Sequence, residues 1–368
     1  MLRLDRHSRV QQHGQVLVVS VLAIIAMMSM LALLLEGGNA YAQQRGTQNG
    51  VDAAANAGAV ALARKLAGST ITTTDVGDAV QAIANANALP AYTAYYTDVS
   101  GNVLDAGGHP AQVGIDAIPS GAQGVTVAGS RTFGTTVGGV IGINSLTASA
   151  DATAITGPLT GGPLLPIVFP INIVDCVTNG DLGTSEDFWV QSNPGDPPDG
   201  PEYIVPLCKT GGGSFMILNL DDSLSCAEEL ATPPSVTWYS FPVQVPSDNG
   251  NDCAKKHLEG VLALKGTVVN IPICSGDCVT SGGSHAEYTI TKVAAFYLDA
   301  VLPMSDKNGG TNPLCQAGTS PSGYPVTTIA GNGSDSCLIG WFVKYITEGP
   351  VGPGSVGNSD SIGVQLIK

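Results

Sequence analysis

The segment that decides the fold is "VLVVSVLAIIAMMSMLALLLEGGNAYAQQRGTQNGVDAAANAGAVALARKLA", residues 16–67. Its apolar first part, Val16 to Leu35, carries no charge. An α-helix of that length spans about 30 Å, which is the thickness of the hydrocarbon core of a bilayer. The second part is rich in alanine and has no proline, so its helix propensity stays high. We therefore predict a transmembrane helix, residues 16–35, that continues outward as a stalk.

The basic residues around the apolar run predict its orientation. Arg3, Arg6 and Arg9 precede the run, whereas only Arg45 follows it closely. Positive charge is retained on the cytoplasmic side of a membrane. Residues 1–15 are therefore expected to be a cytoplasmic tail, and the bulk of the chain is expected to be extracytoplasmic.

A cleaved signal peptide is the alternative to this anchor. Ala40, Tyr41 and Ala42 have the small-x-small pattern of a cleavage site. The apolar run is longer than in ordinary signal peptides, and Glu36 separates it from that site. Both features favour a retained anchor in the cell membrane. Glu36 is either a functional carboxylate or a water-facing residue at the outer interface.

Composition narrows the class of protein. The 368 residues are enough for two modest domains, and with 47 Gly and only 5% aromatic residues they suit turn-rich β structure. The net charge is −15, and Lys and Arg form no cluster. Nucleic-acid binding is therefore excluded, since it needs clustered positive charge.

The cysteines predict a disulfide framework in an oxidising compartment. There are eight of them, all downstream of the membrane segment and in the second half of the chain. They are Cys176, Cys208, Cys226, Cys253, Cys274, Cys278, Cys315 and Cys337. Zinc is the alternative for the close pair in "CSGDC", but His257 and His285 do not stand at zinc-ligand spacing. The pairing is left open.

The region behind the membrane segment has an α+β pattern. Small residues recur along the stalk, so another backbone can approach it closely, within the fold or between subunits. Thr74 is expected to cap a second helix, which Pro90 ends. A hairpin with its turn at residues 100–102 and further antiparallel strands follow, the last from about Ser145 to Ile155. We expect residues 36–155 to form one small α+β stalk domain.

A linker and a mostly β domain are expected in the rest of the chain. Residues 156–166 are dense in Gly and Pro and read as the linker. Residues 167–368 are predicted to form a β-rich domain tied by disulfides, with one short helix from Cys253 to Leu264. The predicted strands lie near residues 165–174, 214–220, 266–274, 286–301, 338–346 and 361–367.

Three features of the N-terminal segment occur together: Gly14-Gln15 before the span, an acidic residue and Gly just after it, and "QNGVDAAANAGA" at residues 48–59. With these features the segment resembles the TadE/TadG-like proteins of Tad/Flp pilus assembly. "GGVIGINSLTASADATAIT", residues 138–156, also resembles the strand that closes this N-terminal module, so the likeness covers roughly residues 10–165. The resemblance implies a pilin-like helix with a small antiparallel sheet, in a single-pass envelope protein of a bacterial adhesive pilus system. Pilin precursors carry Glu five residues after the Gly, where this chain has Val19, so we do not expect a pilin subunit.

Two polar turns could be read as metal sites. Asp221, Ser223 and Ser225 match the Asp-x-Ser-x-Ser pattern with which von Willebrand A domains hold Mg²⁺. That fold needs helices that residues 226–368 do not offer, so we interpret the segment as a turn after a strand. Asp248, Asn249 and Asp252 could ligate Ca²⁺, but the twelve-residue loop with its terminal Glu is missing. We expect no metal site and no cofactor.

Motifs of catalysis are missing from the sequence. It contains neither a Gly-x-Ser-x-Gly elbow nor a phosphate-binding Gly-x-x-x-x-Gly-Lys, and Ser284 beside His285 is no evidence of a nucleophile and base. We therefore assign no catalytic residue. The predicted function is structural: an envelope protein that supports or anchors a pilus, with the bilayer and other envelope or pilus-assembly proteins as partners. The alternatives are a surface adhesin with a β-rich, possibly metal-assisted C-terminal domain, and a secreted hydrolase.

Overall fold

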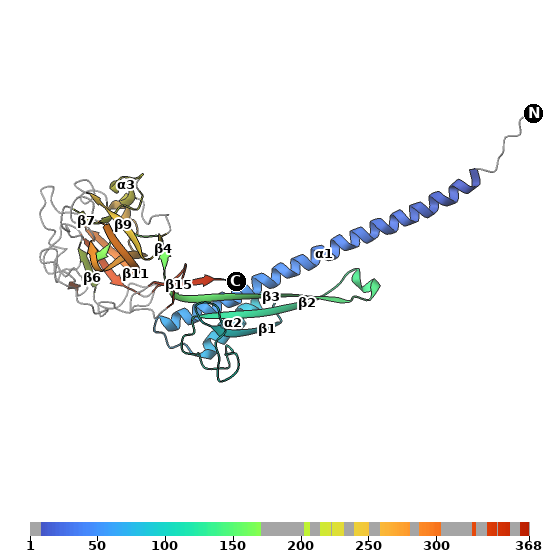
Figure 1. The fold of residues 1–368 in the computed structure, drawn as a ribbon, viewed down its shortest axis with the longest axis horizontal. Coiled ribbons are helices and arrows are strands. Elements are labelled where there is room, and N and C mark those ends of the chain that lie inside the picture. The colour runs from blue at the N-terminus through green and yellow to red at the C-terminus, as the bar shows by residue number, and fades with distance from the viewer. Residues whose placement is uncertain are drawn as a thin grey trace, which may run out of the picture.

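The architecture combines one very long helix with two β-containing units (Figure 1). In the computed structural model of the chain, the described residues are 9–170, 202–206, 214–221, 223–231, 239–249, 258–279, 287–302, 326–328, 337–343, 345–353 and 361–367. The long helix and the mostly β second half confirm the α+β class that the sequence predicted.

Helix α1 runs without a break from Arg9 to Leu66. It contains both the apolar run and the alanine-rich stalk, so the predicted continuity between them is confirmed. Figure 1 shows its N-terminal part projecting alone, away from all other elements. The part from Val16 onward is long and apolar enough to cross a membrane, with a mean hydropathy of 2.8 in its most apolar window.

Helix α2, Thr73–Ala86, begins two residues earlier than a cap at Thr74 would require. Its N-cap is Thr72, whose hydroxyl accepts a hydrogen bond from the Asp75 backbone N–H, while the Asp75 carboxylate accepts one from the Thr72 N–H at 2.7 Å. The predicted cap was wrong because this reciprocal capping box needs an acidic residue three positions after the cap. Asp75 meets that requirement for Thr72, whereas Thr74 would have Gly77 there.

The N-terminal unit holds an antiparallel meander beside α1. Strands β1 (Ala91–Thr97), β2 (Gly124–Gly134) and β3 (Ser145–Pro158) pair in sequence order, and the short 3-10 helix η1 (Gly138–Ile141) connects β2 to β3. The turn after β1 was predicted correctly, since Asp98 N–H donates to the Asn102 carbonyl there.

The C-terminus of the chain completes this sheet. Strand β15 (Ser361–Leu366) pairs antiparallel with β3, and β14 (Tyr345–Glu348) pairs parallel with β15. Among the described residues, the sheet therefore has five strands in the order β1-β2-β3-β15-β14. The single strand predicted for residues 338–346 was wrong, because β13 ends at Phe342 and β14 belongs to a different sheet.

The second unit is built around two long antiparallel strands, β10 (Val268–Val279) and β11 (Glu287–Leu302). Within the described ranges, they belong to an eight-stranded sheet. Its other members are β5 (Phe169–Pro170), β6 (Glu202–Pro206), β7 (Ser214–Leu218), β9 (Val243–Asn249), β12 (Val326–Thr328) and β13 (Cys337–Phe342). The short strands β4 (Gly161–Gly162) and β8 (Tyr239–Ser240) pair with each other, and the short helices are α3 (Cys226–Ala231) and α4 (Glu259–Leu262).

Each unit has a core of its own. In the second unit the Phe296 and Phe342 rings meet edge to face with centroids 4.9 Å apart, among buried Ile271, Leu298 and Leu338. Such aromatic pairs contribute about 0.5–1.5 kcal/mol beyond the area that they bury. The predicted helix at Cys253 to Leu264 is represented by α4 alone, since residues 253–257 lie outside the described part.

Four of the eight cysteines of the predicted framework lie within the described residues. Cys226, Cys274 and Cys337 are buried, and none of the three is a free thiol. Cys278 lies in β10, and the remaining four cysteines lie outside the described residues. The eight-cysteine framework, its pairing, and the division of the chain at residues 156–166 therefore stay predictions.

Candidate functional site

The candidate site is the junction at which the apolar half of α1 enters the folded part of the chain. Between Val16 and Leu35 the large apolar side chains are between 48% and 73% exposed. Soluble proteins rarely expose a contiguous apolar surface of this size to water. Such a surface is typical of a segment that lipid covers.

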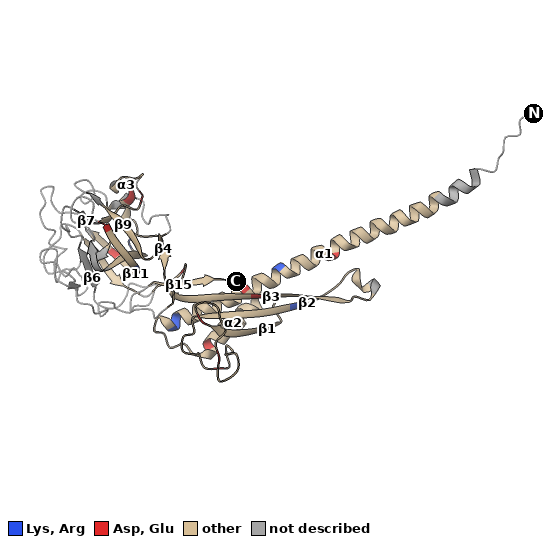
Figure 2. Cartoon of the chain, viewed as in Figure 1, with Lys and Arg blue, Asp and Glu red and all other residues tan. Residues whose placement is uncertain are grey.

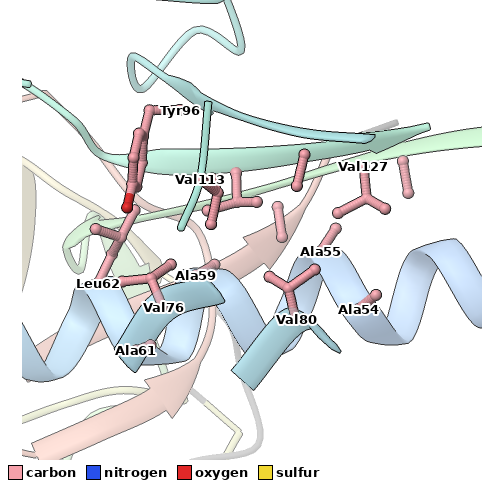
Figure 3. Close-up of a cluster of buried hydrophobic side chains, with 14 of the residues drawn as sticks. Ala54, Ala55, Ala59, Ala61, Leu62, Val76, Val80, Tyr96, Val113 and Val127 are labelled. Carbon is pink, nitrogen blue, oxygen red and sulfur yellow. The ribbon is translucent and has the colours of Figure 1, made fainter. Parts of the chain in front are cut away.

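The stalk half of α1 presents a face of very small residues to the N-terminal unit. Ala54, Ala55 and Ala59 are fully buried, and Figure 3 shows them facing α2 and the sheet, with Val80 of α2 and Val127 of β2 close by. Small side chains allow the helix to lie close to the strands, which secures the stalk by packing rather than by charge.

Two glycines of this face lie close to side chains of other elements. A Cβ atom added at Gly58 would lie 3.0 Å from methyl groups of both Val80 and Val125, and one at Gly50 would lie 3.4 Å from Cβ of Asn87. The stripe of small residues noted in the sequence therefore packs within its own unit.

Arg131 of β2 ties three elements together further along the helix. Its Nη2 donates to the backbone carbonyl of Asn87 at 2.5 Å, and its Nη1 to Oε1 of Gln43 on α1 at 3.4 Å. Asn87 is the C-cap of α2, so a cation placed here also complements the negative end of that helix.

Glu36 is the residue that joins the end of the apolar run to the sheet. Its carboxylate accepts hydrogen bonds from the backbone N–H of Thr136, at 3.1 and 3.2 Å from the two oxygens, and of Val137 at 3.1 Å. Both residues lie at the tip of the β2–β3 hairpin, which runs alongside α1 toward the apolar half (Figure 1). Glu36 was already singled out in the sequence. Its partners could not be predicted, because they lie 100 and 101 positions later in the chain and no local sequence pattern connects them to Glu36.

The three residues of the von Willebrand-like pattern have local structural partners. The Ser223 hydroxyl and backbone N–H both donate to Asp221, at 2.6 and 2.9 Å, and they hold the pKa of that carboxyl below its usual value. Ser225 caps α3: its N–H and hydroxyl donate to Glu228, which lowers the pKa of that carboxyl. The Ser225 hydroxyl is thus engaged in a capping box rather than directed toward Asp221.

The other residues that the sequence singled out are scattered. Asp248 and Asn249 lie in β9, whereas Asp252, Ser284 and His285 are not among the described residues. Ala40, Tyr41 and Ala42 lie within α1. In the part of the chain that the structure describes, no group of three or more His, Cys, Asp and Glu residues could hold a metal ion.

A shallow groove lies between α1 and the C-terminal strands. It is lined on the helix by Asn49, Asp52 and Asn56 and on the strands by Glu348 and Gln365, among others. These five side chains are polar or acidic.

Comparisons with known proteins agree with the sequence motifs at the junction. No curated protein and no solved structure matches the chain. The family model of putative Flp pilus-assembly TadE/G-like proteins does match, over residues 14–61. This range runs from Gly14 through Glu36 to the buried face of the stalk, whereas the predicted likeness of residues 62–165 is not covered. Residues 14–61 of the chain are thus similar to the putative Flp pilus-assembly TadE/G-like family.

Proposed function

We propose that the chain is a non-enzymatic, single-pass envelope protein that supports or anchors a Tad/Flp-type pilus. The observation that carries the proposal is the position of the TadE/G-like segment, residues 14–61. This segment includes the whole exposed apolar run and most of the helix face that packs against the sheet. It therefore joins a bilayer-length helix to a folded unit, as a membrane-anchored stalk requires.

The arrangement that we propose places the N-terminus in the cytoplasm and everything after Leu35 outside the cell membrane. Arg3, Arg6 and Arg9 before the span favour this orientation, and so does the location of all eight cysteines behind it. The β-rich second unit, with its disulfides, would then be presented to other envelope or pilus-assembly proteins. No residue is assigned a catalytic role, and no nucleic acid or cofactor is a proposed partner.

The adhesin alternative is not supported by a further observation. Its metal-assisted form needs the hydroxyls of Ser223 and Ser225 beside Asp221, but Ser225 is hydrogen-bonded to Glu228. The TadE/G-like match favours the assembly role over a secreted hydrolase, because the family is described by pilus assembly.

The anchored topology is tested by intact mass and N-terminal sequencing of the protein from washed membranes, with and without reductant. We expect an uncleaved N-terminus and a mass that rises on reduction by two hydrogens for each disulfide. A chain that begins after Ala42 and is found in the medium would overturn the anchor.

The assembly role is tested by deleting the gene in its own bacterium and counting surface pili by electron microscopy. Pili should be lost on deletion and restored by the unaltered chain. Ile25→Arg should fail to restore them, because a charge at the centre of a span costs about 2.5–3.5 kcal/mol on insertion scales. Ile115→Arg is the matched control, since Ile115 is 69% exposed on a loop far from the span. Undiminished pili after deletion would contradict the proposal.

A further inference from the structure

The tip of the β2–β3 hairpin lies at the level at which the span ends. Glu36 is the first residue after the apolar run, and its carboxylate binds the backbone of Thr136 and Val137. Figure 1 shows the hairpin projecting beyond the other strands along α1. The end of the hairpin therefore has a fixed position along the helix axis relative to Leu35.

Solvent exposure falls at the last turn of the apolar run. Ala32 lies one turn before Glu36 on the same face of α1. It is partly buried, whereas Ala23 and Ala26, farther up the same apolar run, are exposed. Partial burial of Ala32 fits a hairpin tip that reaches the outer end of the span.

The sequence of the tip suits an apolar environment. No residue from Thr132 to Ala150 is charged, and Figure 2 shows neither basic nor acidic colour on the described part of the tip. Ile143 is 48% exposed and Leu146 is 36% exposed, so apolar side chains face outward there. An isoleucine side chain that is exposed to water at a loop tip does not stabilise the protein. At a bilayer surface the same side chain would be removed from water, which is favourable.

Several backbone groups of the tip are already hydrogen-bonded, which lowers the cost of entering a region with little water. Ile143 N–H donates to the Gly138 carbonyl at 2.9 Å, and Thr135 N–H donates to the Asn144 carbonyl at 3.1 Å. The Thr136 and Val137 N–H groups, which face the helix, are bound by Glu36.

We propose that the hairpin tip, residues 134–145, inserts into the interfacial layer of the outer leaflet beside α1. This is a second membrane contact, and its partner is the lipid surface itself. A single helix can rotate and tilt freely in a bilayer, whereas a helix with a hairpin seated next to it cannot. The contact would thus fix the orientation of the exported units relative to the membrane. The inference rests on the proposed anchor.

The experiment places a tryptophan at three positions of the full chain in phosphatidylcholine vesicles whose acyl chains carry bromine. Ile143→Trp reports on the tip, Ile25→Trp on the middle of the span, and Ile115→Trp on a loop beside α2. Bromine near the headgroup and bromine at the middle of the acyl chain are compared, and emission of the unaltered chain is subtracted because it has three tryptophans of its own.

We expect about a two-fold loss of the added emission at Ile143→Trp with bromine near the headgroup, since tryptophan there would lie at the interface. Ile115→Trp should lose none. The neighbouring Gly114 lies against Gly77 of α2, and α2 packs against Gly58 of α1, which is roughly 33 Å along the helix from Glu36. If Ile25→Trp is quenched and Ile143→Trp behaves like Ile115→Trp, the tip does not contact lipid and the inference is wrong while the anchor stands. If Ile25→Trp is not quenched either, the anchor itself fails, and the inference fails with it.

Discussion

The carboxylate of Glu36 accepts hydrogen bonds from the backbone N–H of Thr136, a residue 100 positions later in the chain. The contact links the first residue behind the apolar run to the farthest point of the sheet. The end of the membrane span and the folded unit are therefore joined by two chain segments, the helix itself and the hairpin.

Removal of the Glu36 carboxylate should release the hairpin tip. In Glu36→Ala the N–H groups of Thr136 and Val137 lose their acceptor, and a hydrogen bond of this kind contributes about 1 kcal/mol at a partly exposed site. Their amide exchange, measured by mass spectrometry on the chain in nanodiscs, should become about five-fold faster. Glu36→Gln is the control, because its amide oxygen still accepts a hydrogen bond. Equal exchange in the alanine variant and the unaltered chain would show that Glu36 does not hold the tip.

The same substitution should be destabilising at one glycine of α1 and neutral at another. Gly58→Val places methyl groups where Val80 and Val125 already lie 3.0 Å from the added Cβ, so overpacking should cost about 1–3 kcal/mol. Gly38→Val is the matched control, since nothing lies within 4 Å of its Cβ position. Thermal unfolding in detergent, followed by circular dichroism, should show a lower Tm for the first variant alone. An unchanged Tm for Gly58→Val would mean that α1 is not packed closely at this position.

The helical part of this fold could be predicted from the sequence because its signals are local. Two local features together predict α1: an uncharged run of bilayer length, and an alanine-rich continuation without proline. The strand at residues 361–366 could also be recognised from its composition. Its partner could not, because β15 pairs with β3 across roughly 200 positions of the chain, as between Thr156 and Val364. The Glu36 contact escaped prediction for the same reason.

The C-terminal strand should stabilise the N-terminal unit. Ile362 of β15 is fully buried in the same core as Val51 and Ala55 of α1. Ile362→Ala should therefore cost about 2–5 kcal/mol, the usual range for such a cavity. Leu366→Ala on the same strand is the control, since Leu366 is 44% exposed. Amide exchange in the 51–62 stretch of α1 should rise in the first variant only, and protection that persists there would show that β15 is dispensable for this unit.

The capping box of α2 should make stability depend on pH in acid. Hydrogen bonds from the Thr72 hydroxyl and then the Thr72 N–H lower the pKa of Asp75 in the folded chain. A lowered folded pKa contributes stability that is present above the unfolded value, about 4, and is lost as the pH falls through the folded value. Thr72→Ala should therefore lower the Tm clearly at neutral pH, and the difference from the unaltered chain should shrink in strong acid, where Asp75 is protonated in both. Thr74→Ala is the control, because Thr74 is exposed and is not the cap. If Thr74→Ala lowers the Tm as much, or if the effect of Thr72→Ala is equal at both pH values, the helix does not depend on this capping box.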